Sequence, residues 1–452
     1  MTEVSDISLI SSTLMEGLSK EGLDGYEIYV ANSSGLTIEV KDGDIDVFVN
    51  SDDIGISLRV LKEQKLGVGF STKLSPPDVS TLVREVMHGA SAADPDPFVG
   101  FPGPSAYPRP QLEQFDFDLH KTPIEDKIDM ARDLEAAAKS SDPRIKKVRK
   151  AAYVETTGTV MIRNHSGLDL SYDRTLVAGH IMVVAEDGGN AEIGWDYGFS
   201  PFLGQLKMDS IGKNAAERAV RMLGARPVKS MWIPAILPPW VAADLLSVLS
   251  ASFLADNIQK GKSMLVGRVG EQVFSTHVTI VDDGLYPGGL GSSPFDDEGS
   301  IRQETVLVSK GVIQGFLYDC YTATKENRGS TGNAGRHGIK APPSVQTTNF
   351  YIPNGSFARD DLVSSLDEGL MVTDLIGLHT ADPISGDFSV GAAGVWLKRG
   401  EAVFPVKGVA ISGNIMDLFH NVDGTGTDLA FYGKTGAPSL RVSNLHVAGS
   451  DS

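Results

Sequence analysis

The chain has 452 residues, more than one hydrophobic core usually organises, so we expect two or three domains. Hydrophobic residues make up 41% and charged residues 22%, which is typical of a folded globular protein and excludes a wholly disordered chain. The 58 Asp and Glu residues outnumber the 40 Lys and Arg residues and give a formal net charge of −18. Because no strongly basic run offsets this charge, we expect no direct nucleic-acid binding.

Cysteine usage and apolar stretches indicate the compartment. Cys320 is the only cysteine, so no disulfide can form within the chain, as expected in a reducing compartment. Residues 1–18 lack the basic start and apolar block of a signal peptide. The most apolar long stretch, 233–255, contains three prolines and Asp244, which predicts a buried helix rather than a membrane span. We therefore expect a cytoplasmic protein with no membrane partner.

The first part of the chain alternates apolar and polar residues between short Gly/Asp turns, a pattern typical of an antiparallel meander. A helix should follow from Ser75 to about Ala90, because Ser can cap its start and Pro76 and Pro77 fit its first turn. These elements predict an N-terminal α+β domain over 1–93. The predicted strands are 26–30, 36–40, 45–50, 54–61 and 66–70.

A stretch dense in proline, 94–113, predicts a stiff linker. A helix over 123–140 and a second meander then lead into a helix over 208–223, which predicts a central α+β domain over 114–226. Because meander and helix occur twice, we predict an internal duplication. The predicted strands of the second meander are 148–156, 159–164, 168–174, 175–185 and 191–197.

The remaining segment, 227–452, is rich in glycine and in short β-like runs with regular turns. This pattern predicts a β-rich domain, either barrel-like or sandwich-like. The whole chain is therefore predicted to be α+β, with duplicated meander and helix units followed by a β-rich C-terminal domain.

Few residues offer an obvious reaction centre. No two of the nine histidines lie closer than fifteen residues, whereas zinc ligands usually occur in short-spaced pairs. Cys320 lies in a β-like run, and we interpret it as an inert thiol. Acidic residues cluster at Asp282-Asp283 and Asp296-Asp297-Glu298. They could hold a hard cation, but hydrogen-bonded turns are the favoured interpretation.

Short motifs spread along the C-terminal half resemble the TldD/PmbA family, once described as modulators of DNA gyrase. The N-terminal run Leu66-Gly67-Val68-Gly69-Phe70 resembles it too, so the resemblance covers nearly the whole chain. The matching runs in the C-terminal half are 267–273, 282–284, 295–299, 330–335, 385–389, 411–414 and 437–440.

In the catalytic subunit of this family, a helix carries H-E-x-x-x-H, which supplies two zinc ligands and a base, and a later cysteine completes the site. The resemblance places this motif on Leu246, Ser247 and Ala251, and 244–253 contains no His or Glu. The segment 432–436 contains no cysteine either. The resemblance therefore implies a PmbA/TldE-type subunit that holds no zinc and is inactive alone, with zinc expected only in a TldD-type partner.

This resemblance implies a non-catalytic subunit of a zinc metalloprotease complex that acts on unfolded or modified peptides. A TldD-type subunit and a peptide are the expected partners, and the isolated chain could form a homodimer. Peptide-lining candidates are Gly332, Asn333, Asp387 and Ser389, although each also fits a turn. Two alternatives remain open: a hydrolase with an unrecognised site in the C-terminal domain, and a regulatory binding protein acting on DNA gyrase.

Overall fold

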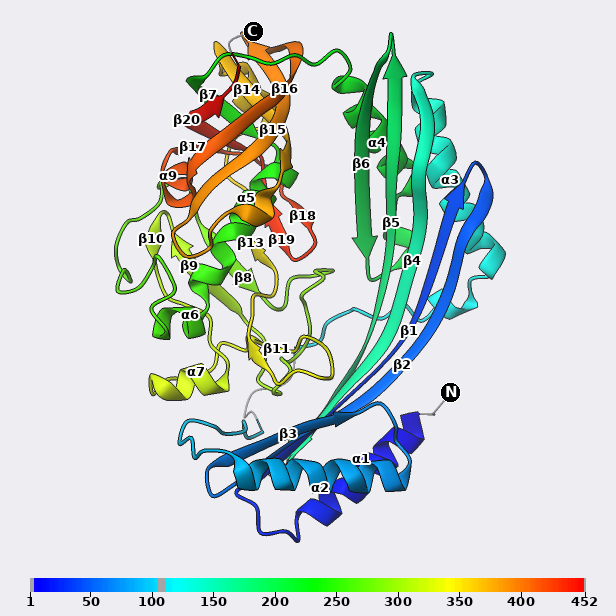
Figure 1. Cartoon of the computed structure of the whole chain (residues 1–452), viewed down its shortest axis with the longest axis vertical. Helices are drawn as coiled ribbons and strands as arrows, with labels where there is room; N and C mark the ends of the chain where they lie inside the picture. Colours follow the sequence, from blue (N-terminus) through cyan, green and yellow to red (C-terminus); the bar gives the residue numbers. More distant parts are fainter. Residues whose placement is uncertain (1–3, 105–109, 451–452) are drawn as a thin grey trace.

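The computed structural model describes residues 4–104 and 110–450. Its N-terminal half is built on one antiparallel sheet in the strand order β3-β2-β1-β4-β5-β6. Helices α1 and α2 cover one end of this long, twisted sheet, and helices α3 and α4 cover the other (Figure 1). The elements are α1 Val4–Leu18, β1 Gly25–Lys41, β2 Asp44–Lys62, β3 Lys65–Ser71, α2 Pro76–Ala92, α3 Ile124–Ser141, β4 Ile145–Asn164, β5 Asp169–Asp187, β6 Asn190–Ser200 and α4 Met208–Arg221.

The predicted duplication is confirmed by this arrangement. Helix, three strands and helix follow one another twice, and β1 pairs antiparallel with β4 at the centre of the sheet. Gly67 in β3 and Gly194 in β6 occupy equivalent positions. A Cβ at Gly67 would lie 2.1 Å from the Val86 carbonyl oxygen in α2, and one at Gly194 would lie 2.1 Å from the Ala215 carbonyl oxygen in α4. Glycine therefore lets each helix pack directly on its sheet.

The prediction of several short strands in each meander was wrong. The runs 26–30 and 36–40 belong to one strand, β1, and the four predicted pieces between 148 and 185 form only β4 and β5. The polar stretch 32–35 looks like a turn, but its backbone pairs with β2 on one side and β4 on the other. Because both ladders satisfy its hydrogen bonds, the strand continues where its side chains lose their apolar pattern.

The proline-rich segment joins the two repeats. Residues 105–109 of the predicted linker 94–113 lie outside the described residues. The rest contains no helix or extended strand, although Pro95 forms an isolated bridge with Lys65. We propose the limits 1–93 and 114–226 for the two repeats, with one addition to the predicted organisation: both contribute strands to the same sheet.

The C-terminal region, for which we propose the limits 227–452, contains the predicted barrel. Strands β16, β15, β14, β7 and β20 pair in that order, and pairing of β16 with β20 closes the ring. A second, smaller sheet runs β10-β9-β8-β13-β19-β18. The strands are β7 Met231–Leu237, β8 Ile280–Asp283, β9 Glu304–Ser309, β10 Val312–Ile313, β11 Ala334–Gly335, β12 Ser344–Val345, β13 Phe350–Tyr351, β14 Glu368–Ile376, β15 Asp387–Lys398, β16 Glu401–Asn414, β17 Val422–Thr425, β18 Ala430–Tyr432, β19 Thr435–Ala437 and β20 Leu440–Ala448.

One helix, α5, lies at the centre of this region. It begins after Pro238, whose following proline occupies the first turn, and buries Leu245, Leu246 and Leu249 completely in the C-terminal core. The helices are α5 Pro239–Ser250, α6 Ala255–Gln259, α7 Cys320–Lys325, α8 Arg359–Ser364 and α9 Ile415–His420. No helix among the described residues has the length and apolarity needed to span a bilayer.

Candidate functional site

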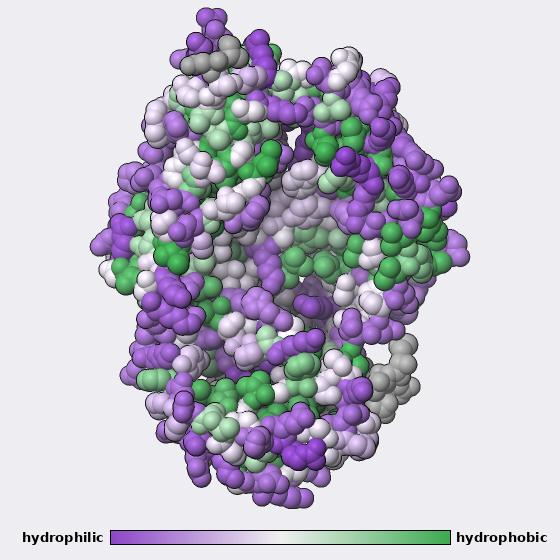
Figure 2. Space-filling model, in the orientation of Figure 1, coloured by the Kyte–Doolittle hydropathy of each residue, from purple (hydrophilic) through white to green (hydrophobic). Residues whose placement is uncertain are grey.

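The central feature of the site is the contact between α5 and the hairpin of β18 and β19. The helix packs against both strands, and the hairpin lies on the side of the C-terminal region that faces β6 (Figure 1). While the leucines of α5 enter the core, Asp244 and Ser247 lie on its exposed face. The surface is hollowed between the C-terminal region and the sheet (Figure 2). These polar positions of α5 therefore face away from the core.

Aromatic rings and one arginine connect α4 and β6 to this part of the C-terminal region. The Arg218 guanidinium lies 4.2 Å from the Trp240 ring centroid and 5.2 Å from that of Trp195, and it pairs with Asp196 at 3.1 Å. The rings of Tyr197 and Tyr432 meet edge to face at 5.7 Å. A cavity of about 540 Å³ lies beside this group, between β6 and α4 on one side and β14, β15 and β16 on the other. Its size falls in the range of small-molecule and peptide sites.

One carboxylate near this hollow, Asp374, influences another, Asp244. Although part of the Asp244 side chain reaches the surface, the groups packed around its carboxyl desolvate it, and this burial together with the charge of Asp374 raises its pKa to about 6. Burial also raises the pKa of Asp374, while a backbone amide and Arg218 act against that rise. A carboxylate with a pKa near 6 can exchange a proton near neutral pH, which is a property of general acids and bases. Asp374 lines the cavity and acts on Asp244 from there, so we interpret the pair as an electrostatic feature of this surface.

The acidic residues singled out from the sequence are engaged in hydrogen bonds. Asp282 is fully enclosed and accepts from Asn333 Nδ2 at 2.7 Å, from the Thr348 amide at 2.7 Å and from the Thr348 hydroxyl at 2.6 Å. Asp296 accepts from the amides of Glu298, Ser300 and Ala334. These contacts favour the interpretation of the cluster as structural turns. Across 4–104 and 110–450, no three His, Cys, Asp or Glu side chains are arranged to hold a metal ion.

A buried ion cluster connects the first repeat to two loops of the C-terminal region. Its members are Glu27, Arg59, Glu298 and Arg336. Arg59 lies 2.6 Å from Glu27 and 3.2 Å from Glu298, and Arg336 lies 2.6 Å from the other oxygen of Glu27. All four side chains are at most 6% exposed. Because two arginines balance two glutamates, the cluster can stay charged inside the protein. It fixes the contact between β1, β2 and the loops around 298 and 336.

The four residues predicted to line a peptide site fall into two separate pairs. Gly332 and Asn333 are buried; the Gly332 carbonyl accepts from Arg302 at 2.7 Å, and the Asn333 amide donates to Asp282 and to the Gln346 carbonyl. Their side-chain and backbone groups therefore hold loops together. Asp387 and Ser389 are exposed on β15, and Asp387 accepts from Asn414 at 2.9 Å. Peptide contact remains a prediction for this exposed pair.

Cys320 begins α7 and does not have the surroundings of a nucleophile. Burial, followed by the charges of Glu298 and Asp296, raises the pKa of its thiol. Its Sγ lies 3.5 Å from the Ser300 hydroxyl, and no histidine contacts it among the described residues. A thiol held in its protonated form is a poor nucleophile. This geometry agrees with the interpretation of Cys320 as inert.

Three family models match consecutive parts of the chain. PmbA/TldA metallopeptidase domain 1 matches residues 26–90, the central domain matches 117–223, and the C-terminal domain matches 230–449. The chain belongs to the PmbA/TldD family.

Relatives of known name or structure resemble the chain over its whole length. "Metalloprotease PmbA" of Escherichia coli O157:H7 is 26% identical over 443 residues, which cover 97% of this chain and 95% of the relative. A Thermotoga maritima crystal structure described as a candidate modulator of a DNA gyrase has a TM-score of 0.91 and 28% identity, covering 98% of this chain and 100% of that one. TldE from Thermococcus kodakarensis shares the fold, with a TM-score of 0.90, 23% identity and coverage of 97% and 100%.

The positions that the PmbA/TldD family resemblance assigns to zinc do not carry zinc ligands in this chain. Leu246 is buried in the core, and the Ser247 hydroxyl donates to the Asp244 carbonyl oxygen at 2.6 Å. Ala251 starts a short 3-10 turn, and its methyl group has no electron pair to offer. The hairpin that would supply the cysteine does lie against α5. The family's framework is therefore present, but the donor set at these positions does not fit zinc.

Sequence reasoning missed the cationic and aromatic residues that line the spaces between the sheet and the C-terminal region. Arg174, Arg218, Arg302 and Lys434 lie far apart in the chain and in no shared motif. A search for closely spaced histidines, cysteines and carboxylates cannot find a site assembled from single residues on several elements. No signal in the single sequence marks these four residues as neighbours of a cavity.

Proposed function

We propose that this chain is the non-catalytic subunit of a TldD/TldE-type zinc metalloprotease complex that acts on unfolded or modified peptides. The feature that carries the proposal is the composition of α5 and of the residue after it: the resemblance places the family's two histidines and glutamate on Leu246, Ser247 and Ala251. Zinc hydrolysis needs nitrogen, sulfur or carboxylate ligands and a base for the water. These side chains supply none of them.

In this proposal the chain contributes surface and shape instead of the reaction centre. Its partner is a TldD-type subunit that holds the zinc, and in the absence of that subunit the chain can pair with itself. The TldE fold of the Thermococcus kodakarensis structure and the PmbA name of the Escherichia coli relative support this placement within the family. We propose that the complex works in the cytoplasm, and that the hollow between the sheet and the C-terminal region forms part of the peptide-binding space (Figure 2).

The decisive experiment measures zinc content and peptidase activity for the purified chain, for a TldD-type subunit from the same cell, and for their mixture. We expect no bound zinc and no activity in the chain alone, and higher activity in the mixture than in the TldD-type subunit alone. A mixture containing a TldD-type subunit with a zinc-binding histidine replaced by alanine serves as the control and should be inactive. Stoichiometric zinc or activity in the chain alone would refute the proposal.

A second candidate is a regulatory protein that binds DNA gyrase, which is favoured by the description of the Thermotoga maritima structure. Purified gyrase and this chain, without any protease subunit, provide its test. Direct binding and a change in supercoiling rate would support this candidate, whereas the absence of binding in this test would reject it and favour the subunit proposal.

A further inference from the structure

A cavity of about 630 Å³ lies between the middle of the sheet and the loops of the C-terminal region. Strands β1, β2, β4 and β5 form one wall, and the loops near 290–293, 335–340 and 434 form the other. Part of its lining is apolar, including Ile54, Val160 and Ile339. The cavity is thus large enough for the end of a short peptide and offers an apolar surface beside its polar groups.

The polar lining of this cavity is mainly cationic, in contrast to the net charge of −18 for the whole chain. Five cationic side chains and only two carboxylates, Asp53 and Asp297, line it. One cation, Arg336, is already paired with Glu27 in the ion cluster. The other four make no ion pair with any carboxylate of the described residues. Of these, Lys340 lies over the Phe70 ring, 5.7 Å from its centroid, which leaves Arg174, Arg302 and Lys434. We call these three residues the cationic group.

Arg302 is the anchor of the cationic group. It is only 9% exposed, and its guanidinium donates from Nε to the Ser293 hydroxyl at 3.0 Å and from Nη1 to the Gly332 carbonyl at 2.7 Å. Its Nη2 has no hydrogen-bond partner among the described residues. The charges of Asp282 and Asp296 act on this guanidinium from nearby, but neither carboxylate forms a direct ion pair with it. An anion entering the cavity would pair with the guanidinium directly.

The other two cations reach the same space from different elements. Arg174 comes from β5, and Lys434 comes from the turn between β18 and β19. Burial lowers the pKa of Lys434, and the charges of Arg302 and Arg174 lower it further, while Asp297 and Asp282 act against this change. Both arginines are therefore close enough to Lys434 to repel it. The Gln346 Nε2 donor, on the same lining, is also buried without a hydrogen-bond partner in the described part of the chain.

We propose that this cavity binds the free C-terminal carboxylate of a peptide through Arg174, Arg302 and Lys434. The inference rests on the proposed function, because it assigns part of the peptide to a place on the non-catalytic subunit. A planar carboxylate has two oxygens that match the donors of a guanidinium, and its charge would relieve the repulsion within the cationic group. The apolar wall formed by Ile54, Val160 and Ile339 would contact the last side chains of the peptide.

Isothermal titration of the full chain alone provides the test, with acetyl-Ala-Val-Leu as the free acid and as its C-terminal amide. The free acid should bind at least about tenfold more tightly than the amide, because only the acid carries the recognised charge. Arg174→Gln and Lys434→Gln should each weaken binding of the acid about fivefold to tenfold and leave binding of the amide unchanged. Lys229→Gln removes an exposed cation that does not line the cavity and should change neither affinity.

Equal affinity for the acid and the amide, including no measurable binding of either, would overturn the inference. A titration with inorganic phosphate tests for a general anion site: phosphate that binds the cavity while the acid shows no preference over the amide also overturns it. Because the chain is tested without a protease subunit, this result is independent of zinc content and of stimulated activity. If the chain shows no preference for the free acid but still raises the peptidase activity of a TldD-type subunit, the cavity assignment alone is rejected. If the isolated chain contains zinc or is active, the proposed function is rejected.

Discussion

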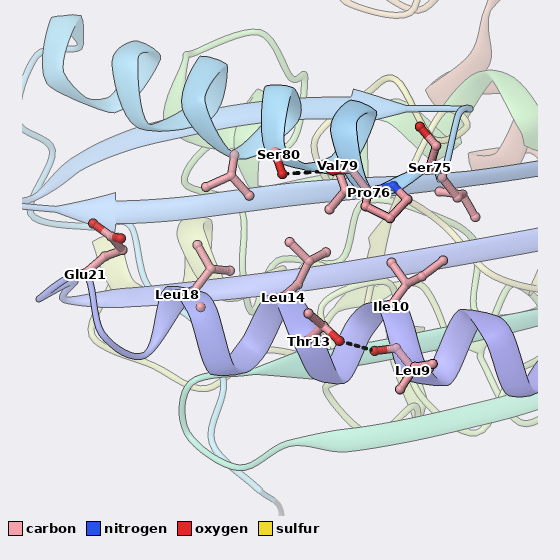
Figure 3. Close-up of a pocket in the computed structure, with 13 residues that line it drawn as sticks. Leu9, Ile10, Thr13, Leu14, Leu18, Glu21, Ser75, Pro76, Val79 and Ser80 are labelled. Carbon is pink, nitrogen blue, oxygen red and sulfur yellow. Dashed lines mark hydrogen bonds between the residues drawn. The ribbon is translucent and has the colours of Figure 1, made fainter.

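The two repeats of the N-terminal half share one topology but pack their helices differently. In the second repeat, α3 and α4 touch closely: a Cβ at Gly212 would lie 2.6 Å from the Leu134 carbonyl oxygen. In the first repeat, a Cβ at Gly17 of α1 would meet nothing within 4 Å. Between α1 and α2 lies an apolar groove of about 810 Å³, toward which Leu14, Leu18 and Val79 project (Figure 3). The same order of elements therefore leaves one helix pair closed and the other open.

The repeats also contact the C-terminal region by different chemistry. The first repeat uses the buried ion cluster around Arg59, and the second uses Arg218 between two tryptophan rings together with the Tyr197–Tyr432 contact. What remains the same is the approach of helix to sheet at Gly67 and Gly194. The close approach of a helix backbone to the sheet is therefore common to both repeats. The contacts that each repeat makes with the C-terminal region depend instead on a few individual side chains.

The largest expected effect comes from removing the centre of the ion cluster. Arg59→Met removes the one cation that pairs with Glu298 among the described residues and leaves Glu27 with Arg336 alone, so we expect a loss of about 3–5 kcal/mol in the free energy of unfolding. Arg218→Met is the matched change in the second repeat and should cost about 1–2 kcal/mol, because Asp196 keeps its bond to Asn214. Urea unfolding at pH 7 measures both. Equal losses of unfolding free energy would show that the ion cluster and the Arg218 contact stabilise the protein to the same extent.

The next largest loss of stability should come from replacing the glycine at the helix–sheet contact, and it should be the same in both repeats. Gly67→Ala and Gly194→Ala each place a methyl group 2.1 Å from a helix carbonyl oxygen, so we expect each to cost about 3 kcal/mol through displacement of α2 or α4. Gly69→Ala is the control, because its methyl group would meet only the side chains of Val86 and Leu82, which can move. A loss confined to one repeat in thermal or urea unfolding would contradict the equivalence of the two glycines.

Much of this fold could be predicted because periodicity reports burial. Alternating apolar residues located the meanders, and helical spacing located α2, α3 and α4 close to their observed limits. Strand length could not be predicted, because the polar residues 32–35 and 157–159 lie where β1 and β4 pair with each other, although their side chains lack an apolar pattern. Their backbone pairing depends on neighbouring strands, which a local pattern does not contain.

The site could be predicted only in part, for a related reason. The family framework and the substitution of Leu246, Ser247 and Ala251 are local properties of the sequence and could be found there. Arg174, Arg302 and Lys434 become neighbours only when β5, a loop and the β18–β19 turn come together. Gly332 and Asn333 were candidates because glycine and asparagine often occur in binding loops, yet their observed contacts hold the chain's own loops.

A smaller effect should separate the closed helix pair from the open one. Gly212→Ala places a methyl group against the backbone of α3 and should lower the free energy of unfolding by about 1–2 kcal/mol. Gly17→Ala meets open space within a helix and should raise it by about 0.5–1 kcal/mol, because alanine favours helix over glycine. Thermal unfolding would reveal these opposite signs. A destabilising Gly17→Ala would show that the groove between α1 and α2 is closed in solution.

The smallest effect concerns the acidic pair that faces the second repeat, and it depends on pH. The folded state raises the pKa of Asp244 to about 6, above its ordinary value of 3.8, so folding favours the protonated carboxyl. The charged form therefore costs stability fully above pH 6, and this cost disappears as the pH falls toward 4. Asp244→Asn should raise the free energy of unfolding by about 1 kcal/mol at pH 8, with allowance for solvent screening, and should have no such effect at pH 4.

Urea unfolding between pH 4 and 8 measures this difference, and Asp360→Asn, which changes an exposed carboxylate of α8, is the control. Asp374→Asn should reduce the benefit of a second change at Asp244, because Asp374 supplies part of the repulsion that raises the Asp244 pKa. If Asp244→Asn has the same effect at both pH values, the Asp244 carboxylate is not desolvated by its surroundings. In that case the side of the C-terminal region facing the second repeat would be open to water, and its contrast with the dry ion cluster of the first repeat would be larger still.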